Sequence, residues 1–473
     1  MNAEHSSSII PIQFYNTLTR TKETFQPLTP KTVRLYTCGP TVYDFAHIGN
    51  FRAYIFEDLL HRFLAFAGYR VLRVMNITDI DDKTIAGAIK EGISLREYTD
   101  RYIAAFMKDC ETLRLAKPDH LPRATDHIPE MVQLVKTLLE KGIAYEKEGS
   151  IYFRISSFPG YGQLCRYDFN EIKTAARTDA DEYEKEEARD FVLWKESKKE
   201  EPSWETEIGS GRPGWHIECS AMSMKYLGET FDIHTGGVDN IFPHHDNEIA
   251  QSEAATGKLF VKYWLHCAHL LVNGEKMSKS KGNFYTLRTL LEKGADPIAI
   301  RYLLLTTHYR DPLNFSEQSL QQAFNTIRHW QAYYQRLDFP VPEKPANPVV
   351  QSAIERAREK FSSSLADDLN ISSAVAGIFE MMKTTNIAFS TGDISPQDTV
   401  ALKKFLLEID SVMAILDPQK EALPQDLMEQ IMLRNTAREK KDFSTADIIR
   451  NELAKQGILL EDTPFGTRWI KQI

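Results

Sequence analysis

The sequence TVRLYTCGP at residues 32–40, followed by HIGN at residues 47–50, decides the fold class of this chain. Residues 32–37 have the composition of a buried strand, and a Gly-Pro turn follows them. After HIGN, apolar side chains recur at helical spacing as far as Gly68, which ends the helix. Residues 69–75 then predict a second buried strand. A strand, a helix and a second strand form a βαβ unit, which implies a parallel sheet.

The composition indicates a globular chain of several domains. The 473 residues, of which 42% are hydrophobic and 26% charged, predict about three domains. No apolar run approaches the roughly 18 residues of a membrane span, and the first residues lack the pattern of a secretory signal. The five cysteines are scattered and odd in number, which favours a reducing, cytoplasmic compartment over a disulfide framework. A net charge of −9 argues weakly against a nucleic-acid binder but allows a local basic surface.

The segment after about residue 117 differs from the preceding residues in its proline content and charge. Prolines punctuate what we expect to be polar helices, and residues 179–190 are dense in charge. This segment is typical of an insertion between two halves of a sheet, with the charged run forming a solvated loop. Residues 209–215 predict a loop that leads into the next helix.

The remaining part of the chain turns from strands to helices. Residues 231–234 and 264–271 predict further strands. After about Asp296 the pattern is helical nearly to the end, and a proline-rich linker at residues 339–345 separates two helical regions.

Two short motifs are typical of phosphate binding. His47 and Gly49 lie where a strand passes to a helix, where free N–H groups and the helix dipole favour an anion. A histidine there can donate to phosphoryl oxygens in a transition state. The second motif, KMSKS at residues 276–280, lies between glycines, and its two lysines can neutralise a leaving pyrophosphate. Taken singly, the first motif is more often a turn histidine and the second a solvated basic loop.

Four further residues have the side chains of a mixed metal site. His244 and Glu248 are four residues apart and share one face of a helix. Cys38 follows the first strand, and Cys219 lies near a helix across the sheet. All four can converge at the carboxyl ends of parallel strands, and zinc is usually held by four such ligands. Without a CxxC pair, however, the spacing by itself favours structural histidines over zinc.

The two phosphate motifs, in this order and on these elements, resemble the nucleotide-binding signatures of class I aminoacyl-tRNA synthetases. Four longer stretches are similar to the hallmark segments of cysteinyl-tRNA synthetases, namely residues 38–44, 76–83, 211–222 and 242–251. The resemblance covers nearly the whole chain and ends at GTRW, residues 466–469. One departure is Asn50, where the first motif commonly ends in histidine. This leaves one ribose or phosphate contact open, although asparagine can still donate a hydrogen bond.

The resemblance implies roles for individual residues. The zinc ligands would be Cys38, Cys219, His244 and Glu248. The cysteine pocket would contain Cys38, Thr78, Trp215, Cys219 and His244. ATP, which enters with Mg²⁺, would contact Gly39, Thr41, His47, Gly49, Asn50, Asp239, Lys276 and Lys279. Catalysis would depend on His47, Asn50, Lys276 and Lys279. The remaining cysteines match no ligand position, and we expect buried thiols at Cys110, Cys165 and Cys267.

The resemblance also implies a reaction and its partners. L-Cysteine and ATP would form cysteinyl-adenylate with release of pyrophosphate, and cysteine would then pass to the 3′ end of tRNA(Cys). One zinc ion would bind the substrate thiol. A hydrophobic pocket separates serine from cysteine by only about 1–3 kcal/mol, whereas a soft thiolate binds zinc far better than a hydroxyl. We expect a monomer with no membrane partner.

Two other functions remain open at this point. A cysteine ligase of the mycothiol pathway, which joins cysteine to an amino sugar, has a similar zinc site and similar ATP motifs but lacks the C-terminal tail. A non-catalytic zinc protein that binds RNA would not need both phosphate motifs. Basic residues after residue 425 and a terminal tryptophan favour tRNA binding, although a solvated helical cap explains them equally well.

The expected fold class is α/β, with a Rossmann-like parallel-sheet catalytic core that carries an insertion and is followed by mostly α-helical C-terminal domains. The core would comprise residues 1–118 and 209–256, separated by a connective insertion at residues 119–208. The further expected segments are the KMSKS loop with a helical stem-contact region (257–338), a linker with a helical bundle (339–424) and a small anticodon-binding domain (425–473).

Overall fold

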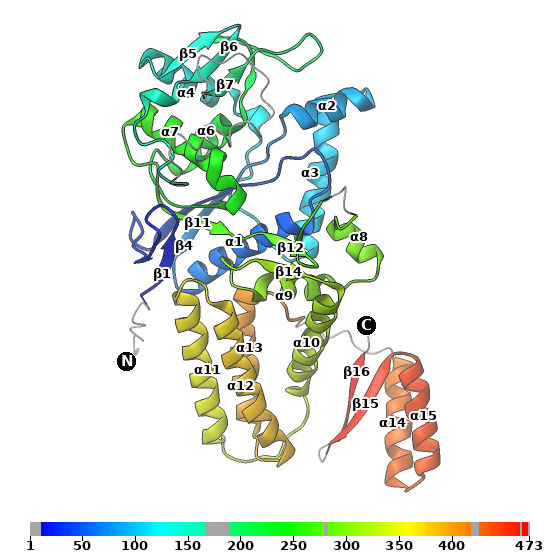
Figure 1. Cartoon of the computed structure of the whole chain (residues 1–473). Coiled ribbons are helices and arrows are strands. Elements are labelled where there is room, and N and C mark those ends of the chain that lie inside the picture. The colour runs from blue at the N-terminus through cyan, green and yellow to red at the C-terminus, as the bar shows by residue number, and fades with distance from the viewer. Residues whose placement is uncertain (1–10, 167–189, 279–281, 418–424, 464–465, 472–473) are drawn as a thin grey trace. The chain divides into compact units, whose positions relative to one another are not determined.

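A computed structural model describes residues 11–166, 190–278, 282–417, 425–463 and 466–471. The chain divides into two compact units (Figure 1). The first comprises Met1–Leu320 together with Leu365–Asn370, and the second comprises Gln321–Ser364 together with Ile371–Ile473. None of the helices within the described residues is long and apolar enough to cross a membrane.

A four-stranded sheet with the strand order β11-β10-β3-β4 forms the centre of the first unit. Its strands are β3 (Thr32–Thr37), β4 (Arg70–Met75), β10 (Phe231–Gly237) and β11 (Val261–Cys267). All three pairings are parallel, with Ile233 opposite Leu35 and Thr37 opposite Met75. The predicted parallel sheet is therefore confirmed, and the carboxyl ends of its strands meet at one edge.

Helix α1 (Ile48–Phe66) connects β3 to β4, as the apolar spacing predicts. Ile48, Phe51 and Ile55 are completely buried, because spacings of three and four residues bring them to one face of the helix. Leu60, on the opposite face, is also completely buried, so the helix is covered on more than one side. Gly68 has a φ of 89°, a left-handed conformation that glycine adopts without steric cost, and it turns the chain toward β4.

Between β4 and α6 the described residues form three α-helices and a separate antiparallel sheet with the strand order β5-β6-β7-β9-β8. The helices are α2 (Asp82–Glu91), α3 (Leu95–Thr112) and α4 (Ile128–Glu140). The strands are β5 (Ala144–Lys147), β6 (Ser150–Phe153), β7 (Phe191–Lys195), β8 (Trp204–Thr206) and β9 (Gly209–Pro213). Helix α4 lies where helices were expected, but the five strands were not predicted, because strands this short carry too few residues to show a clear period of two. Of the charged run at residues 179–190, only the buried Asp190 belongs to the described part of the chain.

The prediction of a loop at residues 209–215 is wrong, because β9 occupies most of it. This glycine-rich segment has a low strand propensity, and its pairing with β7 and β8 comes from tertiary packing. A Cβ at Gly211 would lie 2.5 Å from Trp194 Nε1, so only glycine fits against that buried ring. Strand β9 leads into α6 (Trp215–Leu227), which is the predicted helix.

A small three-stranded sheet carries Lys276, the first residue of the second phosphate motif. Strand β12 (Leu270–Val272) pairs in antiparallel with β13 (Glu275–Lys276) and in parallel with β14 (Leu313–Phe315). The strand predicted at residues 264–271 is therefore two strands in two different sheets. The other elements of this unit are β1 (Gln13–Asn16), β2 (Thr21–Thr24), α7 (Asp246–Thr256), α8 (Leu287–Glu292) and α9 (Pro297–Thr306).

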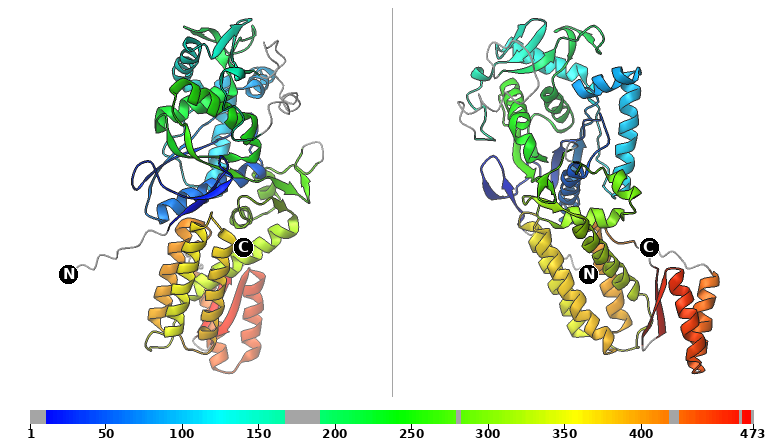
Figure 2. Two further views of the ribbon diagram at one scale, coloured as in Figure 1. Left: turned by 60° about the vertical axis from the view of Figure 1, so that its left-hand side comes forward. Right: turned by 45° about the vertical axis from the view of Figure 1, so that its right-hand side comes forward.

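The second unit is helical, as predicted, apart from a hairpin near its end. Its helices are α10 (Glu317–Arg336), α11 (Pro348–Ala366), α12 (Ile371–Ser390), α13 (Pro396–Met413), α14 (Gln425–Glu439) and α15 (Phe443–Lys455). Strands β15 (Ile458–Thr463) and β16 (Gly466–Lys471) form the hairpin, which lies beside α14 and α15 (Figure 2). These elements share a small core of Ile431, Leu453, Ile458 and Leu460, against which Trp469 packs.

One basic residue after residue 425 is buried and connects α14 to the hairpin. Arg434 on α14 is 1% exposed, forms an ion pair with Asp462 and donates to Thr467 Oγ1 at 2.9 Å. Arg438 is exposed but also pairs with Asp462. Arg434 is therefore not on the basic surface that the sequence suggested, because helical spacing alone does not reveal a partner on a distant hairpin.

Candidate active site

A cavity of about 450 Å³ lies at the carboxyl edge of the parallel sheet. Its lining includes Gly237 at the end of β10 and Cys267 at the end of β11. Ligands of parallel α/β sheets bind at this edge. Nine residues predicted to contact ATP or cysteine also line it: Cys38, Gly39, Thr41, His47, Gly49, Asn50, Trp215, Asp239 and Lys276. The structure thus brings the first phosphate motif, Lys276 of the second motif and two residues of the predicted cysteine pocket, Cys38 and Trp215, to one cavity.

His47 and Asn50 form a reciprocal cap at the start of α1. The Asn50 backbone N–H donates to His47 Nδ1 at 3.2 Å, and the His47 backbone N–H donates to Asn50 Oδ1 at 3.1 Å. Because Nδ1 accepts a hydrogen bond, a neutral His47 ring carries its proton on Nε2. The cap therefore selects the tautomer that can donate to a phosphoryl oxygen.

At two positions of the cavity lining only glycine fits, because atoms of neighbouring residues come too close for a Cβ. A Cβ at Gly49 would lie 2.9 Å from the His47 ring and 3.3 Å from Met277 Cε. A Cβ at Gly39 would lie 1.7 Å from the carbonyl oxygen of Asn76. A larger residue at either position would displace a neighbour at the cavity.

The second phosphate motif is held next to the first. The Ile48 backbone N–H donates to the Tyr285 carbonyl at 3.0 Å, a few residues beyond the KMSKS sequence. The rings of His47 and Phe284 meet edge to face, with centroids 5.2 Å apart. Lys276 is exposed and lines the cavity, so its ammonium can reach a polyphosphate there.

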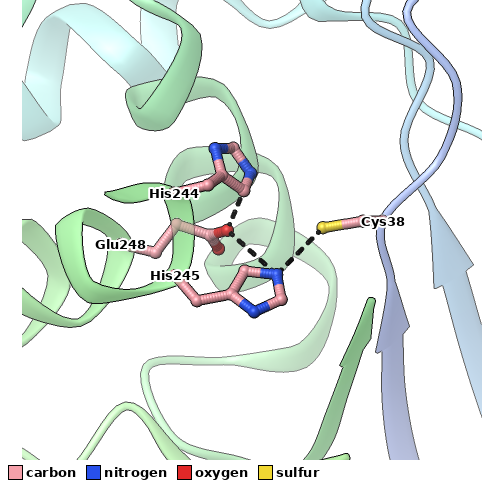
Figure 3. Close-up of side chains that lie close together, drawn as sticks. All are labelled: Cys38, His244, His245 and Glu248. Atoms are coloured by element: carbon pink, nitrogen blue, oxygen red, sulfur yellow. Dashed lines mark hydrogen bonds and ion pairs between the residues drawn. The ribbon is translucent and has the colours of Figure 1, made fainter. Parts of the chain in front are cut away.

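A cluster of metal-ligand side chains adjoins the cavity through Cys38. Ligand atoms of Cys38, His244, His245 and Glu248 all lie within 4.8 Å of one another (Figure 3). Both histidines and Glu248 are at most 1% exposed. The cysteine comes from the end of β3, and the other three side chains come from the turn that enters α7 and from its first residues.

Cys219 on α6 reaches the same cluster. The residue is 1% exposed, and the neighbouring Cys38 and burial raise the pKa of its thiol, while His244 lowers it. Three of the four predicted ligands therefore lie together, and the fourth member of the cluster is His245, whose Nε2 is 3.3 Å from Cys38 Sγ. His245 precedes Glu248 by three residues, and this spacing also puts two side chains on one helical face.

The donor set fits a zinc ion. Glu248 Oε1 is buried and lies 3.0 Å from His244 Nε2, yet within the described residues it has no hydrogen bond of acceptable geometry. Buried carboxylate oxygens rarely lack a partner, and an ion coordinated by both side chains would supply one. Thiol, imidazole and carboxylate are the ligands that zinc takes in proteins. The Nδ1 of His244 lies 2.9 Å from His216 Nδ1, which is an outer contact of the kind that orients a ligating histidine.

The charges in this cluster are strongly coupled. Burial opposes the ionisation of Glu248, but His234 and His244 outweigh it and lower the pKa of Glu248 to about 2. Burial likewise opposes the protonation of His244, but Glu248 and Cys219 outweigh it and raise the pKa of His244 to about 10. The surrounding groups thus favour a carboxylate beside a positive charge, and a divalent cation can replace the imidazolium proton in that role.

Comparison with known proteins identifies the family. Residues 24–325 match the family model of the class I (C) tRNA synthetase catalytic domain, and residues 360–417 match that of the DALR domain. A cysteine–tRNA ligase of Solibacter usitatus is 48% identical over 461 residues, which cover 97% of this chain and 99% of that relative. The chain belongs to the cysteine–tRNA ligase family. A second member, from Leptospira interrogans, is 49% identical and is covered over 100% of its length by 98% of this chain.

Solved structures agree with the fold of this family. Methionyl-tRNA synthetase of Mycobacterium tuberculosis, in complex with methionyl-adenylate, has a TM-score of 0.61 at 17% identity over 81% of this chain and 92% of its own. A leucyl-tRNA synthetase of Agrobacterium radiobacter, in a ternary complex with tRNA, has a TM-score of 0.58 at 12% identity. The match covers 83% of this chain and 85% of that synthetase. The predicted α/β core with an insertion and helical C-terminal domains is confirmed.

In this ligase-family chain, a layer of histidines surrounds the predicted ligands, and the sequence reasoning missed it. His234 Nε2 lies 3.0 Å from Glu248 Oε2, and His245 Nδ1 lies 2.8 Å from His266 Nε2. Burial lowers the pKa of His266 to about 3, so its ring is neutral. The available signal was a histidine inside a predicted buried strand, at His234 on β10 and His266 on β11, because a buried imidazole needs a polar partner.

The remaining predicted site residues differ in how exposed they are and in whether they line the cavity. Trp215 is 42% exposed, lines the cavity and stacks on His244, with ring centroids 4.2 Å apart. Thr78 is 1% exposed and pairs through its backbone with the cavity-lining segment at Thr41. Lys279 lies outside the described residues, so its contact with ATP stays a prediction. Of the three cysteines expected to be buried, Cys165 and Cys267 are buried and Cys110 is half-buried.

Proposed function

We propose that this chain joins L-cysteine to tRNA(Cys) in two steps. L-Cysteine and ATP form cysteinyl-adenylate and pyrophosphate, and the cysteinyl group then passes to the 3′ end of the tRNA. One observation carries the proposal. A buried cluster of thiol, imidazole and carboxylate groups reaches, through Cys38, a cavity that both phosphate motifs line. None of the five cysteines, all of which lie in the described part of the chain, forms a disulfide bond, which suits the reducing cytoplasm.

We assign one zinc ion to Cys38, Cys219, His244 and Glu248. Bound there, zinc would hold the substrate thiol as a thiolate, a form that the hydroxyl of serine does not take at neutral pH. Trp215 covers His244 and faces the cavity, where it can pack against the short side chain of cysteine. Thr78, behind the segment at Thr41, would contact the polar part of the amino acid.

ATP would bind with Mg²⁺ at the start of α1. The helix N-terminus offers N–H groups to phosphates, and the Nε2 proton of His47 would point to the developing charge. Lys276 supplies a cation from the same cavity, and Lys279 would stabilise the leaving pyrophosphate. The contacts to the rest of the nucleotide would come from Gly39, Thr41, Gly49, Asn50 and Asp239.

The C-terminal part would bind the tRNA. The DALR domain match at residues 360–417 supports this role, as do the exposed cations Lys440, Lys441 and Arg450. We retain residues 425–473 as an anticodon-binding domain. We extend the connective insertion to Pro213, because β9 pairs with the strands of its sheet.

Amino-acid-dependent pyrophosphate exchange with all twenty amino acids, followed by charging of tRNA(Cys), tests the proposal. Exchange with cysteine and strong rejection of serine are the expected results. If serine is rejected by only tens-fold, the substrate thiol does not bind zinc, because a size difference alone gives that much. Activation of cysteine without charging would instead favour a cysteine ligase of the mycothiol pathway, which the full-length match to cysteine–tRNA ligases does not favour.

A further inference from the structure

A buried chain of hydrogen bonds connects the cavity segment to α6 through Thr78. The Gly39 backbone N–H donates to Asn76 Oδ1 at 2.8 Å. Asn76 Nδ2 donates to Thr78 Oγ1 at 3.1 Å, and Thr78 Oγ1 donates to Glu218 Oε2 at 2.9 Å. Asn76, Thr78 and Glu218 are at most 2% exposed, so water does not compete for these contacts.

The chemistry of the end groups determines which atom donates in each bond of this hydrogen-bond series. A backbone N–H can only donate, so the Asn76 atom that faces Gly39 is the oxygen and the atom that faces Thr78 is the nitrogen. Thr78 therefore accepts from Asn76 and has one proton to give, which goes to Glu218. Among the described residues, Glu218 has no other hydrogen-bond donor, and its Oε1 is buried without a partner. Turning the Thr78 proton away would leave a buried carboxyl group without any donor, which is costly.

One acceptor position on the Thr78 hydroxyl is left over after these two bonds. A hydroxyl offers one donor and two acceptor positions, and the chain uses the donor and one acceptor. The Thr78 backbone is also fixed, because its N–H donates to the Pro40 carbonyl at 3.0 Å and its carbonyl accepts from the Val42 N–H at 3.1 Å. Pro40 and Val42 line the cavity, and Glu218 lies on α6 between Trp215 and Cys219.

We propose that Asn76 and Glu218 are positioning residues that make Thr78 an acceptor for the α-ammonium group of bound L-cysteine. This inference rests on the proposed function, which places the amino acid beside Thr78. The ammonium group is the strong hydrogen-bond donor of the cysteine zwitterion, since its carboxylate only accepts. A hydroxyl that could rotate would serve a donor or an acceptor, whereas a hydroxyl whose proton goes to Glu218 offers a ligand only an acceptor position, which suits the ammonium. This series of hydrogen bonds thereby favours the binding of α-amino thiols over that of thiol acids that lack the amino group.

The test compares cysteine with 3-mercaptopropionate, which has the thiol and the carboxylate but no ammonium group. Glu218→Leu removes the acceptor that holds the Thr78 proton, and Glu218→Gln retains a carbonyl oxygen at that position. Glu218→Leu should raise the KM for cysteine in pyrophosphate exchange by about tenfold or more, with the KM for ATP and the zinc content unchanged. Inhibition by 3-mercaptopropionate should stay within about twofold of wild type, because the lost contact involves a group that this ligand lacks. Glu218→Gln should restore most of the affinity for cysteine.

The same comparison separates the possible failures. Equal weakening of cysteine and 3-mercaptopropionate in zinc-loaded Glu218→Leu would overturn the inference and leave Glu218 a packing role. If that variant does not fold, Thr78→Val, which removes the hydroxyl with little change in shape, decides by the same ratio of the two ligands. Wild-type protein that shows no cysteine-dependent exchange would refute the proposed function itself, whereas normal exchange with an unchanged ligand ratio in both variants would refute only the positioning role.

Discussion

Gly49 illustrates how one absent side chain determines the position of a functional group. A Cβ there would lie 2.9 Å from the His47 ring, closer than such contacts normally come. Gly49→Ala should therefore displace the imidazole and lower kcat for pyrophosphate exchange by about 100-fold, since a misplacement of about 1 Å can cost that much. Steady-state exchange kinetics with saturating cysteine and ATP measure the effect.

Gly68→Ala, at the other end of the same helix, is the matched control. Open space surrounds a Cβ at this position, but its φ of 89° strains any L-residue. This variant should lose thermal stability and keep its exchange kinetics. A Gly49→Ala enzyme with normal kcat would show that the His47 ring is not required at its observed position.

The metal cluster allows two assignments of its fourth ligand, and zinc content distinguishes them. Cys219→Ala should lose most of its zinc, because a thiol ligand is removed from a buried site. His245→Ala should retain zinc after gentle purification with an affinity lowered by about 10- to 100-fold, as expected for an outer contact. Elemental analysis before and after dialysis against a chelator measures both. If His245→Ala loses its zinc and Cys219→Ala retains it, His245 is the ligand in place of Cys219.

At the scale of secondary-structure elements, the hairpin β15–β16 is attached to α14 by a buried guanidinium. Arg434 is 1% exposed and pairs with Asp462 on β15. Asp462→Ala should destabilise this part of the chain by about 3 kcal/mol, because it leaves a buried charge without its partner. Hydrogen exchange of residues 425–463 measures the loss. Asp447→Ala, which removes an exposed carboxylate from the neighbouring α15, is the control and should have little effect.

The same ion pair predicts a pH dependence. Hydrogen bonds from Arg434 lower the pKa of Asp462 to about 2, below the ordinary value of about 3.9. Because the folded-state pKa is depressed, the stabilisation is fully present above pH of about 4 and is lost as the pH falls through about 2. Acid unfolding of the segment should therefore begin at a higher pH in Asp462→Ala than in wild type. Identical acid profiles would mean that the pair does not stabilise the hairpin.

At the scale of the whole molecule, adenylate chemistry and tRNA binding depend on different parts of the chain. The cavity and the metal cluster use residues before residue 290, whereas α14, α15 and the hairpin share a small core of their own. Removal of residues 425–473 should leave cysteine-dependent exchange nearly intact and sharply reduce charging of tRNA(Cys). Binding of tRNA should also become less salt-dependent, because cationic contacts to phosphates are lost. A folded, truncated protein that charges tRNA normally would make the tail a structural cap.

Several features of the fold and the site could be predicted from the sequence because they depend on local patterns. The strands at residues 32–37 and 69–75 and the helix between them follow from apolar periodicity and from Gly68. The position of HIGN follows from the βαβ unit, because the turn after a parallel strand lies at the carboxyl edge of the sheet, where ligands bind. His244 and Glu248 share a face because they are one helical turn apart.

Other features were decided only by tertiary structure. The glycine-rich strand β9 exists because β7 and β8 pair with it, since its own residues have little strand propensity. The partners of Arg434 and of the histidines at residues 245 and 266 lie on other elements, so local patterns cannot tell a buried imidazole or guanidinium from an exposed one. The direction of the Thr78 hydroxyl depends on Asn76, two residues away, and on Glu218, which is 140 residues away in the sequence. Local periodicity thus determined which elements form, and long-range packing determined which polar groups meet and in which orientation.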